Sequence, residues 1–136
     1  DAFYFGSDLE FQPSLSFIVA LARQNPETPI VVAHSGGYEL LRYFFHLRDL
    51  DNVYFDLSFS LQYLADSSLY LDLRKVLRFW DRKRIMFGSD FPYASPTYQW
   101  EILNEVMTSL SFSPGDIDAI AFSNAHSLFK RNNDSI

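Results

Sequence analysis

The chain contains no cysteine, no excess of positive charge and no long hydrophobic run. Without cysteine it has no disulfide framework and no thiolate metal site, so any bound metal must use histidine and carboxylate ligands. The formal net charge of −6 argues against nucleic acid or an anionic membrane as a ligand. No segment reaches about 18 consecutive apolar residues, and no signal-peptide pattern is present. These absences favour a soluble, cytoplasmic protein whose partners include neither nucleic acid nor a membrane.

Glycine is also sparse, with 5 residues, and the motifs that depend on glycine are missing. There is no Gly-x-Gly-x-x-Gly, no Walker motif and no nucleophile elbow around Ser89, which we expect to shape a turn. The length of 136 residues is enough for one domain. It is well short of the roughly 250 residues typical of a closed eight-stranded α/β barrel. Because the chain starts at Asp1 without a methionine, we expect a fragment or a processed product.

Apolar runs of strand length alternate with segments of helical periodicity. Residues 30–33, 52–57 and 85–87 are apolar runs bounded by breakers, as in strands buried on both faces, and residues 2–5 form a further short candidate. The predicted helical faces consist of Leu15, Ile18 and Ala22 after Pro13; Tyr38, Leu41 and Phe45 within residues 37–48; Leu69, Leu73, Val76, Leu77 and Trp80; and Trp100, Leu103, Val106, Met107 and Leu110.

The C-terminal part adds a capped helix. Ser113 to Asp116 resembles a capping box with Pro114 in the first turn, a final helical piece ends near Phe129, and residues 130–136 form a frayed polar tail. The whole pattern predicts an α/β fold with parallel strands, in which three to four βα units follow one another with right-handed crossovers. We expect one domain over residues 1–136.

Two of the predicted strands end in an ionisable side chain among small residues. The run at 85–87 leads through Gly88 and Ser89 to Asp90, and the run at 30–33 leads directly to His34. Parallel α/β sheets place their chemistry at the carboxyl ends of strands, so His34 and Asp90 are the candidate site residues. The alternatives are an Asp90 that caps a turn and a His34 that is a hydrogen-bonded core histidine.

Four stretches then occur in a recognisable order: VVAHSGG at 31–37, NVYFDLS at 52–58, RIMFGSDFP at 84–92 and NAHSLF at 124–129. In type and order they resemble the amidohydrolase-related family, which includes metal-dependent hydrolases and decarboxylases of the aminocarboxymuconate-semialdehyde decarboxylase kind. The resemblance runs from about Pro13 to Phe129. It implies the C-terminal half of a distorted (β/α)8 barrel of the TIM type. In this barrel the strands before His34, at Val53 and before Asp90 are the sixth, seventh and eighth.

The resemblance also implies a chemistry. A divalent metal, with zinc expected, would activate a water that acts on a small carbonyl or carboxylate substrate. Asp90 resembles the eighth-strand carboxylate that holds the metal and accepts the proton of the water. His34 resembles the sixth-strand histidine, which either binds the metal or hydrogen-bonds the water and the substrate. An imidazole that is neutral near pH 7 suits both roles.

The other polar residues of these motifs carry weaker expectations. Asp56 and Ser58 either support the site or form a turn, and Asn124 resembles a structural, helix-capping asparagine. His46 and His126 are not expected to be ligands. Two alternatives to an enzyme stay open. One is a non-catalytic barrel half that serves as a binding or structural module, and the other is an unrelated doubly wound α/β domain with Asp90 at a switch point.

The sequence lacks several features of the family pattern. The first-strand His-x-His pair is absent, and residues 2–5 lead to Phe5 and Gly6 where a fifth-strand histidine would be wanted. One histidine and one aspartate are too few for a catalytic zinc, which takes three protein ligands and a water. We therefore expect the parent protein to be an enzyme and this chain alone to be inactive.

Half a barrel would also leave open sheet edges and an uncovered apolar interior. We expect the strand alternation to aim about half of the large strand side chains at the barrel centre. This predicts a homo-oligomer, or association with a missing N-terminal half. The side chains in question are Ile30, Val32, Val53, Phe55, Ile85 and Phe87.

Overall fold

The computed structural model describes residues 15–131. The strand predicted at residues 2–5 and the helix start at Pro13 therefore lie outside the described residues. The frayed tail was predicted to begin too early, because the last helix continues to Arg131. The remaining part of that tail, residues 132–136, is not described.

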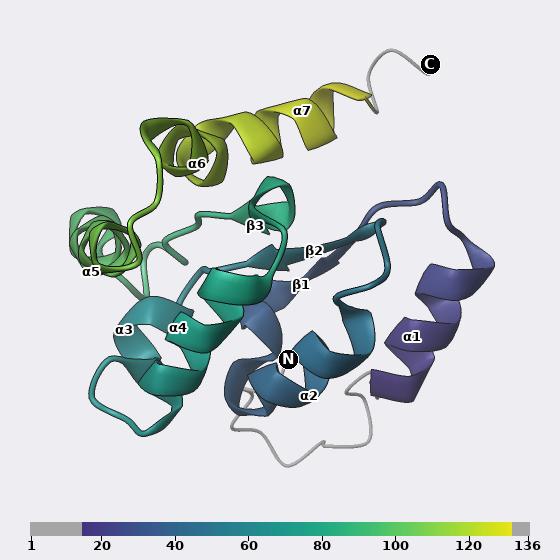
Figure 1. The fold of residues 1–136 in the computed structure, drawn as a ribbon, viewed down its shortest axis with the longest axis horizontal. Helices are drawn as coiled ribbons and strands as arrows, with labels where there is room; N and C mark the ends of the chain where they lie inside the picture. Colours follow the sequence, from purple (N-terminus) through teal and green to yellow (C-terminus); the bar gives the residue numbers. More distant parts are fainter. Residues whose placement is uncertain (1–14, 132–136) are drawn as a thin grey trace.

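A parallel three-stranded sheet lies at the centre of the described fold (Figure 1). Its strands are β1 (Ile30–Val32), β2 (Val53–Asp56) and β3 (Ile85–Met86), and they lie side by side in chain order. Sequential order of parallel strands is what βα units wound in one direction produce, as in a (β/α)8 barrel. The predicted α/β fold with its strand order is confirmed.

The helices connect the strands and cover the sheet. In Figure 1, α2 and α4 lie on one side of the sheet, and α6 and α7 lie on the other. The elements are α1 (Leu15–Gln24), η2 (Ala33–Glu39), α2 (Leu40–Leu47), α3 (Ser60–Leu64), α4 (Leu69–Phe79), η3 (Arg82–Arg84), α5 (Pro96–Ser109), α6 (Pro114–Asp118), the π-helical turn η4 (Ala119–Ser123) and α7 (Asn124–Arg131). No helix within residues 15–131 has the length and apolar character needed to cross a bilayer.

The core lies between the sheet and the helices α2 and α4. Phe55 of β2 stacks on Trp80 with 3.9 Å between ring centroids, and Trp80 in turn lies 6.0 Å from the ring of Phe44 on α2. Val53 and Ile85 are fully buried beside them. The periods predicted for α4 and α5 are confirmed, because their predicted faces are buried or half-buried.

The expectation about the strand side chains was wrong in one respect. The register pairs Ile30 with Val53, Val32 with Phe55, and Phe55 with Ile85, so these five residues point to the same side of the sheet. That side faces α2 and α4. The opposite side carries another set, namely Val31, which is 43% exposed, with Tyr54, Asp56 and Met86. Periodicity fixes which residues share a face but not which face is covered, and this is why the assignment failed.

The buried face predicted for the second helix was also wrong. Tyr38 and Phe45 are 58% and 53% exposed, whereas the buried side chains of α2 are Leu40, Tyr43, Phe44 and Leu47. The helix begins at Leu40 rather than near residue 37, because residues 34–37 all have positive φ and cannot belong to a right-handed helix. Tyr38 therefore precedes the helix and does not share a helical face with Leu41 and Phe45.

Arg84 ties the N-terminal ends of the strands together. Its side chain is buried, and the guanidinium donates to the carbonyl oxygens of Arg48 (2.8 Å), Leu50 and Val53 (3.3 Å). The guanidinium carbon also lies 5.2 Å from the ring centre of Trp80. A buried cation is tolerated only when its donors are satisfied, and here backbone carbonyls of the chain before β2 satisfy them.

Replacing Arg84 with alanine should destabilise the chain by about 2–4 kcal/mol, since it removes charge-assisted hydrogen bonds and leaves buried carbonyl groups unpaired. Chemical denaturation measures this loss. Lys83→Ala is the matched control, because Lys83 is exposed and surface substitutions usually stay within about 0.5 kcal/mol. Equal unfolding midpoints for the two variants would contradict the role given to Arg84.

The predicted capping box at the start of α6 is confirmed. The Ser113 hydroxyl accepts from the Asp116 N–H at 3.1 Å, and the Asp116 carboxylate accepts from the Ser113 N–H at 3.1 Å and from the hydroxyl at 2.8 Å. The hydroxyl hydrogen bond, the backbone hydrogen bond and then the charge of Arg82 lower the pKa of Asp116 below its ordinary value of 3.8.

A lowered carboxyl pKa stabilises the folded chain above the unfolded-state pKa, and this stabilisation is lost as the pH falls through the folded-state pKa. Ser113→Ala removes the hydroxyl that contributes most to the shift. The Tm difference between wild type and Ser113→Ala should therefore be largest near pH 7 and should shrink below about pH 4. Thermal melts across this pH range test it, and a pH-independent difference would refute the linkage.

Candidate functional site

The chain leaves β1 through a left-handed turn. His34, Ser35, Gly36 and Gly37 have φ angles of 53°, 53°, 82° and 60°. For residues other than glycine this conformation costs roughly 1–2 kcal/mol each, so His34 and Ser35 must be held there by other contacts. Gly36 is required for a second reason, because a Cβ atom at this position would lie 2.7 Å from Cγ of Tyr43. Strained backbone of this kind concentrates at functional sites.

The contacts that hold the turn come from the end of β2. The His34 N–H donates to Oδ2 of Asp56 at 3.5 Å, and the Ser35 hydroxyl donates to the carbonyl oxygen of Asp56 at 2.9 Å. The Asp56 carboxylate also accepts from the Ser58 N–H at 2.9 Å and from the Ser58 hydroxyl. Asp56 and Ser58 therefore hold His34 in place while they also form a turn, and their support of a catalytic site stays a prediction.

The end of β3 approaches the same carboxylate. A Cβ atom at Gly88 would lie 2.9 Å from Oδ1 of Asp56 and 3.0 Å from Cβ of Ser58. Only glycine leaves room for this approach. The carboxyl ends of all three strands thus meet around one carboxylate.

The ring of His34 is oriented by Ser58. Its Nδ1 lies 2.8 Å from the Ser58 carbonyl oxygen and 3.0 Å from the Ser58 hydroxyl oxygen, and that hydroxyl itself donates to Asp56. Both neighbours of Nδ1 therefore act as acceptors, which assigns the proton of the neutral ring to Nδ1. The lone pair then resides on Nε2, the nitrogen suited to bind a metal or accept a proton.

Asp90 lies after the end of β3 in a turn of its own. It has φ 62°, is half-buried, and its carbonyl oxygen accepts from the Tyr93 N–H at 2.9 Å. Ser89 accepts from the Phe91 N–H at 3.3 Å, so this serine shapes the turn as predicted. Asp90 and His34 both follow carboxyl ends of parallel strands with β2 between them, as expected. The contacts of His34 described above lead to Asp56 and Ser58 rather than to Asp90.

Aromatic side chains line this end of the sheet. The Phe59 ring meets His34 edge-on with 5.9 Å between centroids, and Tyr63 stacks on Phe59 at 5.2 Å. In the loop that follows Asp90, Phe91 and Tyr93 are 75% and 81% exposed. An aromatic surface therefore adjoins both candidate residues.

The other two histidines have ordinary surroundings. His46 is exposed on α2, and His126 is exposed with its ring stacked on Phe122 at 5.1 Å. Asn124 has a structural role other than the expected helix cap, because its side-chain amide donates to the carbonyl oxygens of Arg82 and Ile85, both at 2.7 Å. It joins the start of α7 to the start of β3.

Sequence reasoning missed three residues that build the candidate site. Ser35 is fully buried and bonds to Asp56, Gly88 admits the carboxylate, and Phe59 packs on His34. The sequence signal for Ser35 and Gly88 is a small residue just after the end of a predicted strand. No feature of the sequence indicates the role of Phe59. Its φ of 60° is unusual for a bulky residue, so the residue type does not predict this backbone conformation.

The described residues do not make a complete metal site. Within residues 15–131, no group of three or more His, Asp or Glu side chains is arranged to hold an ion. His34 and Asp90 supply two donors of suitable type. A catalytic zinc normally takes three protein ligands.

Solved structures with the same architecture are all larger than this chain. A TIM-barrel protein of uncharacterised function from Bordetella bronchiseptica superposes with a TM-score of 0.66 and 17% identity, covering 85% of this chain and 38% of its own. An amidohydrolase from Burkholderia multivorans, solved with bound zinc, gives a TM-score of 0.65 and 21% identity over 85% and 49% of the two chains. The 2,6-dihydroxybenzoate decarboxylase from Rhizobium superposes with a TM-score of 0.59 and 17% identity, over 87% of this chain and 40% of the decarboxylase.

These likenesses confirm the fold as part of a TIM-type barrel, and the chain spans less than half the length of these structures. A comparison with curated proteins gives no match. The family model described as Amidohydrolase matches residues 5–131, which is nearly the whole chain. The chain therefore belongs to the amidohydrolase family.

Proposed function

We propose that this chain forms the sixth to eighth strands of a metal-dependent hydrolase or decarboxylase, in which a metal-activated water acts on a small carbonyl or carboxylate substrate. The observation that carries the proposal is His34. It is held in a costly left-handed conformation with its Nδ1 committed to Ser58, at the carboxyl end of a parallel strand. Chemistry in parallel α/β barrels concentrates at this edge of the sheet, and the fixed tautomer leaves the lone pair of the ring on Nε2.

In this proposal Asp90 is a metal ligand that also accepts the proton of the water, and His34 presents Nε2 to the metal or to the water and substrate. Asp56 and Ser58 are positioning residues, because they act through the ring and backbone of His34. The exposed rings of Phe91 and Tyr93 lie next to Asp90 in the chain and would limit water access on that side.

A divalent metal, with zinc the expected ion, would lower the pKa of a bound water towards neutrality and polarise the substrate carbonyl or carboxylate. His34 and Asp90 have the right donor types, and the crystal structure of the Burkholderia relative contains zinc. The two residues would hold such an ion only with further donors from outside residues 15–131, since the described residues form no group of three.

The exposed surface of the sheet suggests which partners would complete the barrel. Val31 is 43% exposed on the face of the sheet away from α2, and β1 is one of the two edge strands of the described sheet. Association with an N-terminal half, or with a second copy, would cover this apolar surface. A cytoplasmic location stays a prediction.

The alternative of a non-catalytic barrel half is also supported by one observation. A non-catalytic barrel half would explain why the described residues lack a third ligand. In that case His34 and Asp90 would be retained only as polar parts of turns. The doubly wound alternative is set aside, because the chain belongs to the amidohydrolase family and its strands lie in sequential order.

Metal titration of the isolated chain distinguishes these readings. With two candidate ligands, Zn²⁺ should bind weakly, with a Kd of about 10–1,000 μM, in line with an incomplete site. His34→Gln and Asp90→Asn should each weaken binding at least about fivefold. The matched controls His46→Gln and His126→Gln should leave the affinity unchanged. Competition with a chromogenic chelator measures the Zn²⁺ affinity of the wild type and of these four variants.

Hydrolase and decarboxylase activity of the isolated chain should be negligible for the same reason. A stoichiometric, tightly held metal would contradict the two-ligand count and would imply donors from a second chain. Affinity that is unaffected by both His34→Gln and Asp90→Asn would reject the proposed site and favour the non-catalytic module.

A further inference from the structure

Helix α4 has two different faces. Its inner face is apolar and carries the buried residues Leu73, Val76 and Leu77. The residues of the opposite side, which we call the α4 outer face, are spaced i, i+3, i+4, i+7 and i+8, so they form one continuous strip. They are Leu71, Arg74, Lys75, Arg78 and Phe79.

The α4 outer face combines exposed apolar groups with three cations, of which Lys75 lies 5.8 Å from the ring centre of Phe45. Leu71 and Phe79 are 71% and 64% exposed at its two ends. Ion pairs within residues 15–131 involve Arg42, Arg48, Arg82 and Arg84 but none of the three cations of this face. Three of the chain's 11 basic residues are thus concentrated on two turns of one helix, in a protein with 17 acidic residues.

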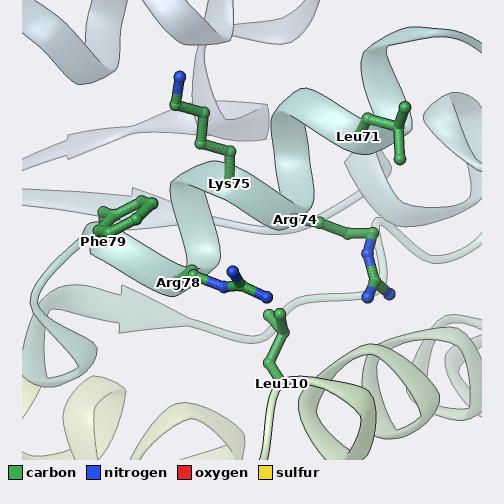
Figure 2. Close-up of a pocket in the computed structure, with 6 residues that line it drawn as sticks. All are labelled: Leu71, Arg74, Lys75, Arg78, Phe79 and Leu110. Atoms are coloured by element: carbon green, nitrogen blue, oxygen red, sulfur yellow. The ribbon is translucent and has the colours of Figure 1, made fainter.

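A groove of about 330 Å³ follows this face, and Leu110 at the end of α5 forms its far wall. In Figure 2, Arg74 and Arg78 extend from α4 on the side of Leu110, and Leu71, Lys75 and Phe79 project from the neighbouring row of the helix. All six side chains line the groove. The C-terminal end of α5 therefore lies beside α4 at this surface.

Helix α5 carries a complementary strip. Tyr98, Glu101 and Glu105 are all exposed and are spaced i, i+3 and i+7, so they share one side of α5. Neither glutamate takes part in an ion pair among the described residues. We call these three residues the α5 acidic strip.

The charges of the two strips have matching spacing. Arg74 and Arg78 are four residues apart, as are Glu101 and Glu105, so each pair is separated by about 6 Å along its helix. Like charges at this spacing disfavour the helix that carries them. Each pair therefore costs its own helix some stability and would gain only when it meets charges of the opposite sign.

From this match we infer that the α4 outer face binds the α5 acidic strip of a second copy of the chain. In a two-fold symmetric pair the contact forms twice, because α4 of each copy meets α5 of the other. Leu71, Phe79 and Tyr98 would supply apolar contact around the charges. This surface involves neither the sheet edge nor the candidate site, so it does not depend on the proposed catalytic role.

Charge reversal provides the test. The variants Arg74→Glu/Arg78→Glu and Glu101→Lys/Glu105→Lys should each weaken self-association at least about tenfold, because each places like charges opposite one another. An equimolar mixture of the two variants should associate as the wild type does, since both contacts of the mixed pair are again complementary. Sedimentation velocity over a concentration series gives the association constants.

Two controls separate this contact from general charge effects and from misfolding. Lys83→Glu/Lys130→Glu changes the net charge by the same amount at exposed positions elsewhere and should leave association unchanged. Arg74→Gln/Arg78→Gln avoids new repulsion and should weaken association less than the reversal does. Far-UV circular dichroism checks that each variant is folded.

Raising the salt concentration from about 0.05 M to about 0.5 M should weaken the wild-type pair, because exposed charges are screened. A monomeric wild type, association that neither reversal affects, or a mixture that fails to recover would each overturn the inference. Failure to recover in the mixture, with both reversals weakened, would indicate a different acidic partner for α4.

Discussion

The carboxylate of Asp56 is the interaction on which the candidate site depends. It accepts hydrogen bonds from the Ser58 N–H and hydroxyl and from the His34 N–H, and Gly88 leaves the space that it occupies. A partly buried carboxylate is costly unless hydrogen bonds satisfy it. Because its donors come from the segments after β1 and β2, satisfying the charge also fixes how the ends of these strands lie beside β3.

The two ends of the sheet differ in their hydrogen bonds and in their backbone conformation. At the N-terminal end, Arg84 and Asn124 donate to backbone carbonyl groups and join β3 to the chain before β2 and to α7. At the carboxyl end, the backbone of His34 and Asp90 adopts positive φ, which costs energy. The stable end thus supports the strained end, a division that barrel enzymes share.

The described residues carry more unpaired surface than a closed fold needs. One such surface is the sheet face with Val31, and the other is the α4 outer face. The first carries Val31 beside Tyr54 and Asp56, and the second carries three cations between exposed apolar side chains. Contacts at the charged surface would be screened by salt more strongly than apolar contacts at the sheet face.

Local patterns in the sequence determined the elements and the family. The apolar runs predict β1, β2 and β3 in order, the 3.6 period predicts α4 and α5, and the motifs around His34 and Asp90 indicate an amidohydrolase. Only the tertiary structure decided which side of each strand is covered, where α2 starts, and that Asp56 holds His34. These features depend on strand register and on left-handed backbone, and neither leaves a trace in the spacing of apolar residues.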